Sequence, residues 1–226
     1  MFRFLSIILF GLLLMACNPA EDSDSLLGEI ELKAALDAAD ITELRESLET
    51  IEKHHQANKT GLKLNPGAKS EDIAQLEKEL QCKIPKELAE IWKWHNGEST
   101  SSFIWYHRFL SVEDALSEYQ ELTAHELSLW KSDWIPVFEF EGEWYGVKCD
   151  KEQRMASPVV FYFVEDEPHI AYVNLSRYMK TMATAMEKGA LSWGGIAWEA
   201  DVHRLDDIFS ELNPDMQFPY FVPEKR

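Results

Sequence analysis

Basic residues are scarce in this sequence of 226 residues. Only 22 Lys and Arg stand against 40 Asp and Glu, which gives a formal net charge of -18. Such a surface is not expected to bind nucleic acid or an anionic membrane surface directly, because both attract positive charge. The charge favours a basic protein as partner. Solubility alone also explains it, so charge does not identify the partner by itself.

The usual catalytic and cofactor motifs are also missing. The sequence has no glycine-rich phosphate loop and no Gly-x-Ser-x-Gly elbow. His125-Glu126 begins like the helix of a zinc protease, but Leu129 stands where the second histidine is needed. The remaining histidines have no Cys or His at ligand spacing. We therefore expect no metal, no cofactor and no enzymatic activity.

No hydrophobic run reaches the roughly 20 residues that a membrane-spanning helix needs. The longest run covers residues 4–16 and follows Arg3, which is the layout of a secretory signal. It ends in the tetrapeptide Leu-Met-Ala-Cys, which resembles the lipobox of bacterial lipoproteins. In such proteins the cysteine becomes the first mature residue and carries lipid, including palmitate.

This pattern predicts a signal peptide over 1–16, lipidation of Cys17 and a polar tether over 17–27. Two or three acyl chains hold a protein on a bilayer durably, so we expect a protein of the bacterial envelope. Asn18 follows the cysteine, where Asp would favour the inner membrane, so the outer membrane is favoured. The alternative is an ordinary signal peptide cut after Ala16 or Ala20.

Few cysteines remain for structural roles, since the sequence has three in all. If Cys17 carries lipid, Cys82 and Cys149 are the two thiols left. Outside the cytoplasm they would be able to form a disulfide. Equally, both cysteines would be explained as small buried hydrophobic residues that are not bonded to each other.

The hydrophobic spacing changes along the chain from a helical period to a period of two and back again. This order predicts an α+β fold with antiparallel hairpins rather than regular βαβ alternation. Helices are expected over 26–39 and 41–57, from Ser70, from Pro85 to Asn96, from Ser111 to about Leu127, over 175–188 and near 199–212. Strands are expected over 103–110, 134–140, 144–149, 158–164 and 169–173.

Aromatic and acidic residues on the strands are the candidates for partner binding. On a strand, the members of an adjacent aromatic pair point to opposite faces, so one of each pair is expected in the core and the other at the surface. An exposed aromatic side chain ringed by acids is a plausible binding hot spot. Charge at hairpin turns is also explained by solubility and edge protection. The candidates are Trp105, Tyr106, Glu139, Glu141, Glu143, Trp144 and Tyr145.

Residues 64–98 contain, in this order, the pairs Leu76-Glu77, Ile84-Pro85 and Asn96-Gly97. With these motifs the segment resembles the start of the SUKH superfamily, the Smi/Knr-like cell-wall-assembly-regulator domain. The resemblance implies an α+β fold, no known catalytic machinery and a role in protein recognition. The resemblance also implies that Glu90–Gly97, with the sequence EIWKWHNG, is the end of a helix whose tryptophans mostly pack in the protein interior. His95 is then not expected to belong to a functional site.

The resemblance covers about residues 28–190, and we expect 191–226 to be an extension packed on that domain. Many bacterial members look like immunity proteins that neutralise a toxin in the cytoplasm. The lipobox departs from that pattern and points to a toxin acting in the periplasm or membrane. The alternatives are an envelope scaffold or cell-wall assembly factor and, less favoured, a hydrolase using carboxylates such as Glu139 and Glu143.

Overall fold

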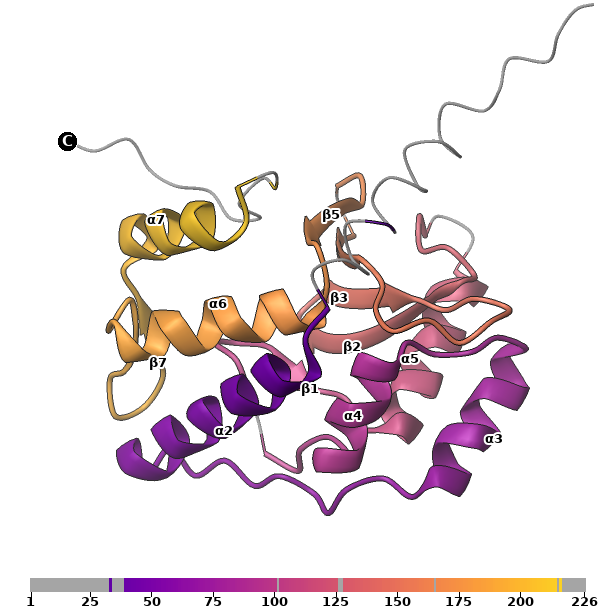
Figure 1. The fold of residues 1–226 in the computed structure, drawn as a ribbon, viewed down its shortest axis with the longest axis horizontal. Helices are drawn as coiled ribbons and strands as arrows, with labels where there is room; N and C mark the ends of the chain where they lie inside the picture. Colours follow the sequence, from indigo (N-terminus) through magenta and orange to yellow (C-terminus); the bar gives the residue numbers. More distant parts are fainter. Residues whose placement is uncertain are drawn as a thin grey trace, which may run out of the picture.

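A five-stranded antiparallel sheet with the order β1-β2-β3-β4-β5 forms the centre of the molecule (Figure 1). The structure is a computed structural model that describes residues 33, 39–100, 102–125, 128–164, 166–214 and 216. Helices precede and follow the sheet in the chain, so the predicted α+β class is confirmed. The strands are β1 (Arg108–Phe109), β2 (Trp134–Phe140), β3 (Glu143–Lys148), β4 (Val159–Phe163) and β5 (His169–Tyr172).

Six helices lie in the described part of the chain, and most begin where the sequence predicts. Asp40 and Ser111 accept hydrogen bonds from the first backbone N–H groups of their helices. The helix expected from Ser70 includes that residue, and Lys69 takes the capping position instead. The helix expected over 26–39 falls almost wholly outside the described residues. The helices are α2 (Ile41–Asn58), α3 (Ser70–Leu80), α4 (Lys86–Trp94), α5 (Val112–Ala124), α6 (Leu175–Glu187) and α7 (Val202–Leu212).

The sheet separates two hydrophobic clusters because successive side chains of a strand point to opposite faces. On β3, Tyr145 joins the main core while its neighbour Trp144 packs on the smaller cluster. The main core also takes residues from α2, α4, α6 and α7. In Figure 1, α7 runs along α6, and α6 runs along α2. The smaller cluster consists of Leu122, Trp130, Trp134, Val160 and Tyr162.

The strand predicted over 103–110 is wrong for most of its length, since only Arg108 and Phe109 are extended and paired. Ile104 and His107 exchange backbone hydrogen bonds across a tight turn instead. Trp105 lies in that turn with a φ of 55°, a conformation that a strand does not contain. Trp105 and Tyr106 are therefore turn residues, and strand alternation does not apply to them.

The segment after residue 190 contains a second, two-stranded sheet that the sequence does not predict. It consists of β6 (Leu191–Trp193) and β7 (Trp198–Ala200), followed by α7. Trp198 of β7 is buried in the main core, as are three residues of α7. These residues therefore contribute to the same hydrophobic core as the sheet. The α7 residues are Leu205, Ile208 and Phe209.

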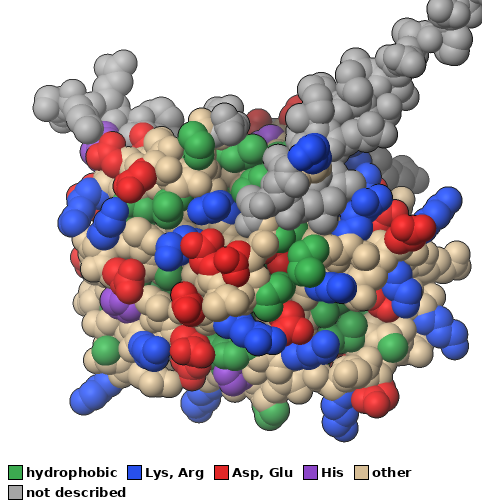
Figure 2. Space-filling view, in the orientation of Figure 1, with side chains coloured by type: hydrophobic (Ala, Val, Ile, Leu, Met, Phe, Trp, Pro, Cys, Tyr) green, Lys and Arg blue, Asp and Glu red, His purple; other side chains and the backbone are tan. Residues whose placement is uncertain are grey.

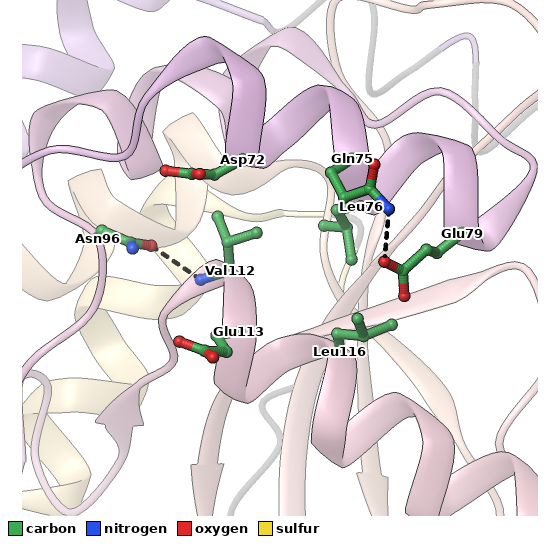
Figure 3. Close-up of a pocket in the computed structure, with 8 residues that line it drawn as sticks. All are labelled: Asp72, Gln75, Leu76, Glu79, Asn96, Val112, Glu113 and Leu116. Carbon is green, nitrogen blue, oxygen red and sulfur yellow. Dashed lines mark hydrogen bonds between the residues drawn. The ribbon is translucent and has the colours of Figure 1, made fainter.

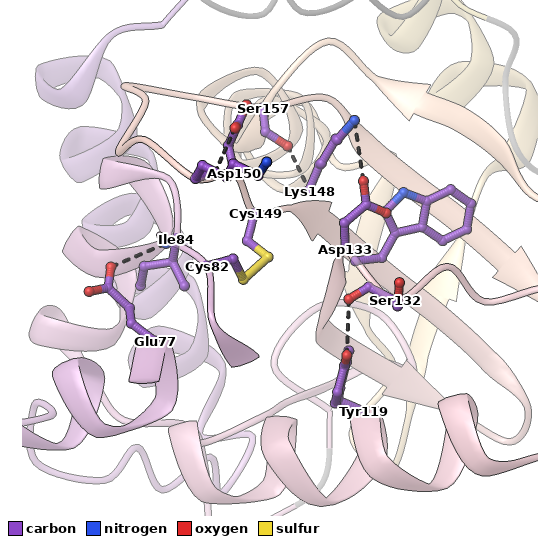
Figure 4. Close-up of a disulfide and its surroundings, with 12 residues drawn as sticks. Glu77, Cys82, Ile84, Tyr119, Ser132, Asp133, Lys148, Cys149, Asp150 and Ser157 are labelled. Atoms are coloured by element: carbon purple, nitrogen blue, oxygen red, sulfur yellow. Dashed lines mark hydrogen bonds and ion pairs between the residues drawn. A yellow bond between two sulfur atoms is a disulfide. The ribbon is translucent and has the colours of Figure 1, made fainter. Parts of the chain in front are cut away.

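Cys82 and Cys149 form a disulfide, so the bonded alternative is the one found (Figure 4). The bond links the loop after α3 to the residue that follows β3, and the two Cα atoms are 5.7 Å apart. Next to it, Lys83 and Asp150 exchange backbone hydrogen bonds of 2.6 and 3.0 Å. The covalent bond and this short bridge together fix the end of α3 against the sheet.

The residues around Asn96-Gly97 make contacts between α4 and α5. Trp92 is buried, and its indole N–H donates a 3.0 Å hydrogen bond to the carbonyl of Leu110. The Asn96 side chain accepts a 2.8 Å hydrogen bond from the backbone N–H of Val112, at the start of α5. Gly97 has a φ of +72°, and a Cβ there would lie 2.7 Å from the Cα of Ser111. These contacts join the end of α4 to the start of α5.

Candidate functional site

The side of the sheet that carries the smaller cluster is only partly covered, and a groove remains beside α5. Its floor is formed by Leu122, Trp144, Tyr162 and Val164, and its volume is about 320 Å³. The Trp144 and Tyr162 rings stack with centroids 5.9 Å apart. The side chain of Val164 is 55% exposed. We call this floor and its rim, Glu118, Glu121, His125 and Ser128, the Trp144 surface.

Carboxylates outnumber cations next to the Trp144 surface. The guanidinium of Arg108 lies between three carboxylates, at 3.5 Å from Asp114, 3.6 Å from Glu118 and 3.4 Å from Glu139. One positive charge therefore faces three negative ones at this site. Glu121 adds a further acid on the rim of the groove. The result is an apolar floor beside an excess of negative charge.

Glu118 links the charge cluster to the aromatic floor. One of its carboxylate oxygens accepts a 3.2 Å hydrogen bond from the indole N–H of Trp144. Partial burial raises the pKa of the Glu118 carboxyl, while the bond from Trp144 opposes the rise and the nearby charge of Glu139 adds to it. A cation brought by a partner would offset this burial and repulsion.

The predicted partner-binding residues do not form one site, because the sheet divides them. Glu139 is paired with Trp144 in the β2–β3 ladder, and both point toward α5. Phe140 is paired with Glu143, and both point to the opposite face, where Glu143 lies 3.3 Å from the ring of His107. Tyr145 is fully buried in the main core and has no surface to offer a partner.

Three predicted partner-binding residues remain: Trp105, Tyr106 and Glu141. Tyr106 is 42% exposed, and its ring stacks on Phe140 with centroids 5.3 Å apart. Its hydroxyl donates a 3.4 Å hydrogen bond to the carbonyl of Trp198. Trp105 is half-buried against the main core, and Glu141 lies exposed in the β2–β3 turn. Of the seven residues, Trp144 lines the groove, and Glu139 is connected to its rim through Arg108, which also contacts Glu118.

The same geometry bears on the hydrolase alternative, which requires Glu139 and Glu143 to act on one substrate. Paired general acids and bases must reach the same bond from nearby positions. Glu139 is held by Arg108 on one face of the sheet, and Glu143 lies beside His107 on the other. This pair therefore does not form a catalytic dyad. Among the described residues, no group of three or more His, Cys, Asp or Glu is arranged to hold a metal ion.

Of the eight residues that line the groove, sequence reasoning selected only Trp144; it missed those supplied by α5 and β4 and by the segments that follow them. Glu118 and Glu121 lie three residues apart on α5, the spacing that places both on one side of a helix. That spacing was a usable signal for an acidic helix face. It did not indicate that this face meets Trp144, because the contact joins segments distant in sequence.

On the face shown in Figure 2, acidic and basic side chains are interspersed, with small groups of hydrophobic side chains between them. That face is therefore not a surface of one charge, despite the net charge of the chain. No helix among the described residues is both long and apolar enough to span a bilayer.

Comparison with known proteins yields one result that covers half of the chain. The model of the SMI1 / KNR4 family (SUKH-1) matches residues 67–180. The match includes the disulfide, the Asn96-Gly97 junction and the Trp144 surface. No curated protein matches the chain. The predicted resemblance is confirmed: the chain belongs to the SMI1 / KNR4 family (SUKH-1).

Proposed function

We propose that this protein is a lipid-anchored, non-enzymatic binding module of the bacterial envelope that captures a basic protein, in the manner of an immunity protein neutralising a toxin. Membership of the SMI1 / KNR4 family supports protein recognition rather than catalysis. The Trp144 surface is the observation that carries the proposal. It combines an aromatic and aliphatic floor with an acidic rim, which are the two elements of a hot spot for a cationic partner.

The charge on the rim of the Trp144 surface indicates what kind of partner this surface would bind. Arg108 already neutralises part of the acidic cluster, but Glu121 has no cation paired with it among the described residues. A partner with Lys or Arg beside an exposed apolar side chain would meet both the charge and the floor. Such an interaction associates quickly at low salt and weakens as salt rises, because mobile ions screen the attraction.

The envelope location rests on two independent features. The N-terminal segment resembles a lipoprotein signal with Cys17 as the lipidated residue. The Cys82–Cys149 disulfide is a bond that persists in oxidising compartments outside the cytoplasm. Replacing Cys17 with alanine should move the protein from the detergent phase to the aqueous phase, or leave it uncleaved. An unchanged detergent-phase partition of variant protein from which residues 1–16 have been cleaved would refute the lipid anchor.

Crosslinking of the full-length protein in its native cells, followed by capture and mass spectrometry, tests the proposed partner. A single basic, toxin-like protein would support the immunity-like role. A set of envelope-assembly proteins would replace it with the scaffold role. Recovery of no protein partner would overturn both.

A further inference from the structure

A second groove lies on the opposite side of α5 from the Trp144 surface, between α5 and α3 (Figure 3). Its volume is about 410 Å³, within the range of roughly 300–1,000 Å³ that is typical of ligand sites. The base of the groove is apolar: Leu76 of α3 and Val112 of α5 are buried there, and Leu116 of α5 is half-buried. In Figure 3 the side chains of α3 face those of α5 across the groove. We call it the α3–α5 groove.

Three carboxylates edge the α3–α5 groove from both helices. Asp72 and Glu79 lie seven residues apart on α3, which places them on the same side of that helix, and Glu113 belongs to the first turn of α5. All three are exposed. In the described part of the chain none of them forms an ion pair, whereas the cluster beside the Trp144 surface has Arg108.

The contacts that these carboxylates do make leave their negative charge in place. Asp72 accepts a 3.2 Å hydrogen bond from the backbone N–H of Lys69, and Glu79 accepts a 2.8 Å hydrogen bond from the Gln75 amide. The groove is therefore apolar at its base and has at its edges three negative charges that form no ion pair in the described part of the chain, two of them in the first turns of α3 and α5. Charge complementarity then selects a segment with cations on its edges and an apolar side chain between them.

We propose that the α3–α5 groove is a docking site for a short basic segment of a protein, with Lys or Arg facing Asp72, Glu79 and Glu113 and an apolar side chain on the floor. This site is separate from the Trp144 surface, and its argument does not use Trp144. Its α3 wall is fixed, because the chain after α3 is bonded through Cys82 to Cys149. A preformed groove binds without the entropic cost of ordering its own walls.

A hexapeptide with the sequence KLKKLK, blocked at both ends, is a suitable probe, and ELEELE of the same length is the opposite-charge control. The full chain, labelled on Leu and Val methyl groups and kept in nonionic detergent, is titrated with each peptide and observed by NMR. We expect KLKKLK to shift the methyl signals of Leu76, Val112 and Leu116, and ELEELE to shift none. Shifts confined to Leu122 and Val164 would instead place the peptide on the Trp144 surface and overturn the inference.

Charge variants separate a specific groove from general attraction. The triple variant Asp72→Asn, Glu79→Gln and Glu113→Gln should weaken KLKKLK binding about tenfold, as the loss of three exposed charge contacts implies. A second triple variant with the same net charge, Glu46→Gln, Glu152→Gln and Asp207→Asn, changes exposed acids outside the groove. It should stay within about twofold of the unmodified chain.

If both triple variants weakened KLKKLK binding equally, the binding would depend on overall charge alone, and the docking site would be overturned. Absence of KLKKLK binding to the unmodified chain would also overturn it. All six positions are exposed, so neither variant removes a core contact. The proposed capture of a basic partner is read separately, from crosslinking in native cells. A failed groove therefore does not imply a failed partner, or the reverse.

Discussion

Trp144 donates its indole N–H to a carboxylate oxygen of Glu118 across 3.2 Å, so a strand aromatic and a helix acid are fixed together at one groove. Each restrains the other: the bond orients the ring, and the ring partly buries the acid. The Trp144 surface thereby presents an ordered aromatic floor before a partner arrives.

Replacement of Trp144 by alanine should weaken binding of the captured partner by about 2 kcal/mol or more, roughly thirtyfold, which is the usual loss for a tryptophan hot spot. Tyr106→Ala is the control, because Tyr106 is an aromatic residue with an exposed side chain that lies against Phe140 on the other side of the sheet, whereas Trp144 is half-buried at the groove. Calorimetry with the purified partner measures both. Equal losses in the two variants would contradict the assignment of the surface.

Removal of the disulfide by the double change Cys82→Ala and Cys149→Ala should lower the free energy of unfolding. The two cysteines are 67 residues apart in sequence, and the chain-entropy model gives a loss of about 4 kcal/mol for a loop of that length. Urea unfolding of the two proteins under oxidising conditions measures the difference. A reducing agent should bring the unmodified chain toward the variant and leave the variant unchanged; no response of the unmodified chain would count against the bond.

Gly97→Ala should destabilise the fold more than an ordinary glycine substitution. A Cβ at Gly97 would meet the backbone of Ser111, whereas a Cβ at Gly189 would meet nothing within 4 Å, although both residues have positive φ. We expect a loss of about 1 kcal/mol for Gly189→Ala from the backbone conformation and at least about 2 kcal/mol more for Gly97→Ala from the clash. Thermal unfolding distinguishes the two, and equal losses would show that the close approach has no cost.

Glu87 should make the stability depend on pH. It is fully buried, and its carboxylate accepts hydrogen bonds from the backbone N–H groups of Leu175 and Ser176 at the start of α6. Burial raises its pKa from 4.5 to about 7, against the opposing effect of those bonds. Because its pKa is higher in the folded state than in the unfolded state, protonation of Glu87 stabilises the fold. This stabilisation is complete below about pH 4.5 and is lost as pH rises through about 7.

The Glu87 contribution should fall by about 2 kcal/mol between pH 5 and pH 8. Glu98 and His55 also have shifted pKa values, so the quantity to measure is the difference between the unmodified chain and Glu87→Gln. Urea unfolding of both proteins at several pH values should show that the unmodified chain loses stability faster as pH rises. Parallel curves would mean that Glu87 does not titrate in this range.

Much of the fold is predictable from sequence because its signals are local. The hairpin across Glu141–Glu143 follows from a period of two and a glycine turn, and α5 follows from Ser111 as its cap. Strands β6 and β7 have three residues each, too few to show a period. The strand predicted over 103–110 failed because the tight turn at Trp105 interrupts a run of suitable residues.

The site was less predictable than the fold. Trp144 was selected from strand alternation and Glu139 from the crowding of acids on one hairpin. Trp144 lines the groove, and Glu139 is connected to its rim through Arg108. Glu143 was grouped with them because it is close in sequence, yet its place in the ladder puts it on the other face. The contribution of α5 depends on how that helix packs across the sheet. Such tertiary contacts leave no local pattern in a single sequence.

Site-specific photocrosslinking in native cells tests the central claim most directly. A photoreactive residue at Val164, on the Trp144 surface, is compared with one at Ile196, which is 92% exposed in the loop between β6 and β7. We predict that one basic protein is crosslinked from position 164 and not from position 196. Capture of the same protein from both positions, or from position 196 alone, would contradict the assignment of the Trp144 surface as the binding site.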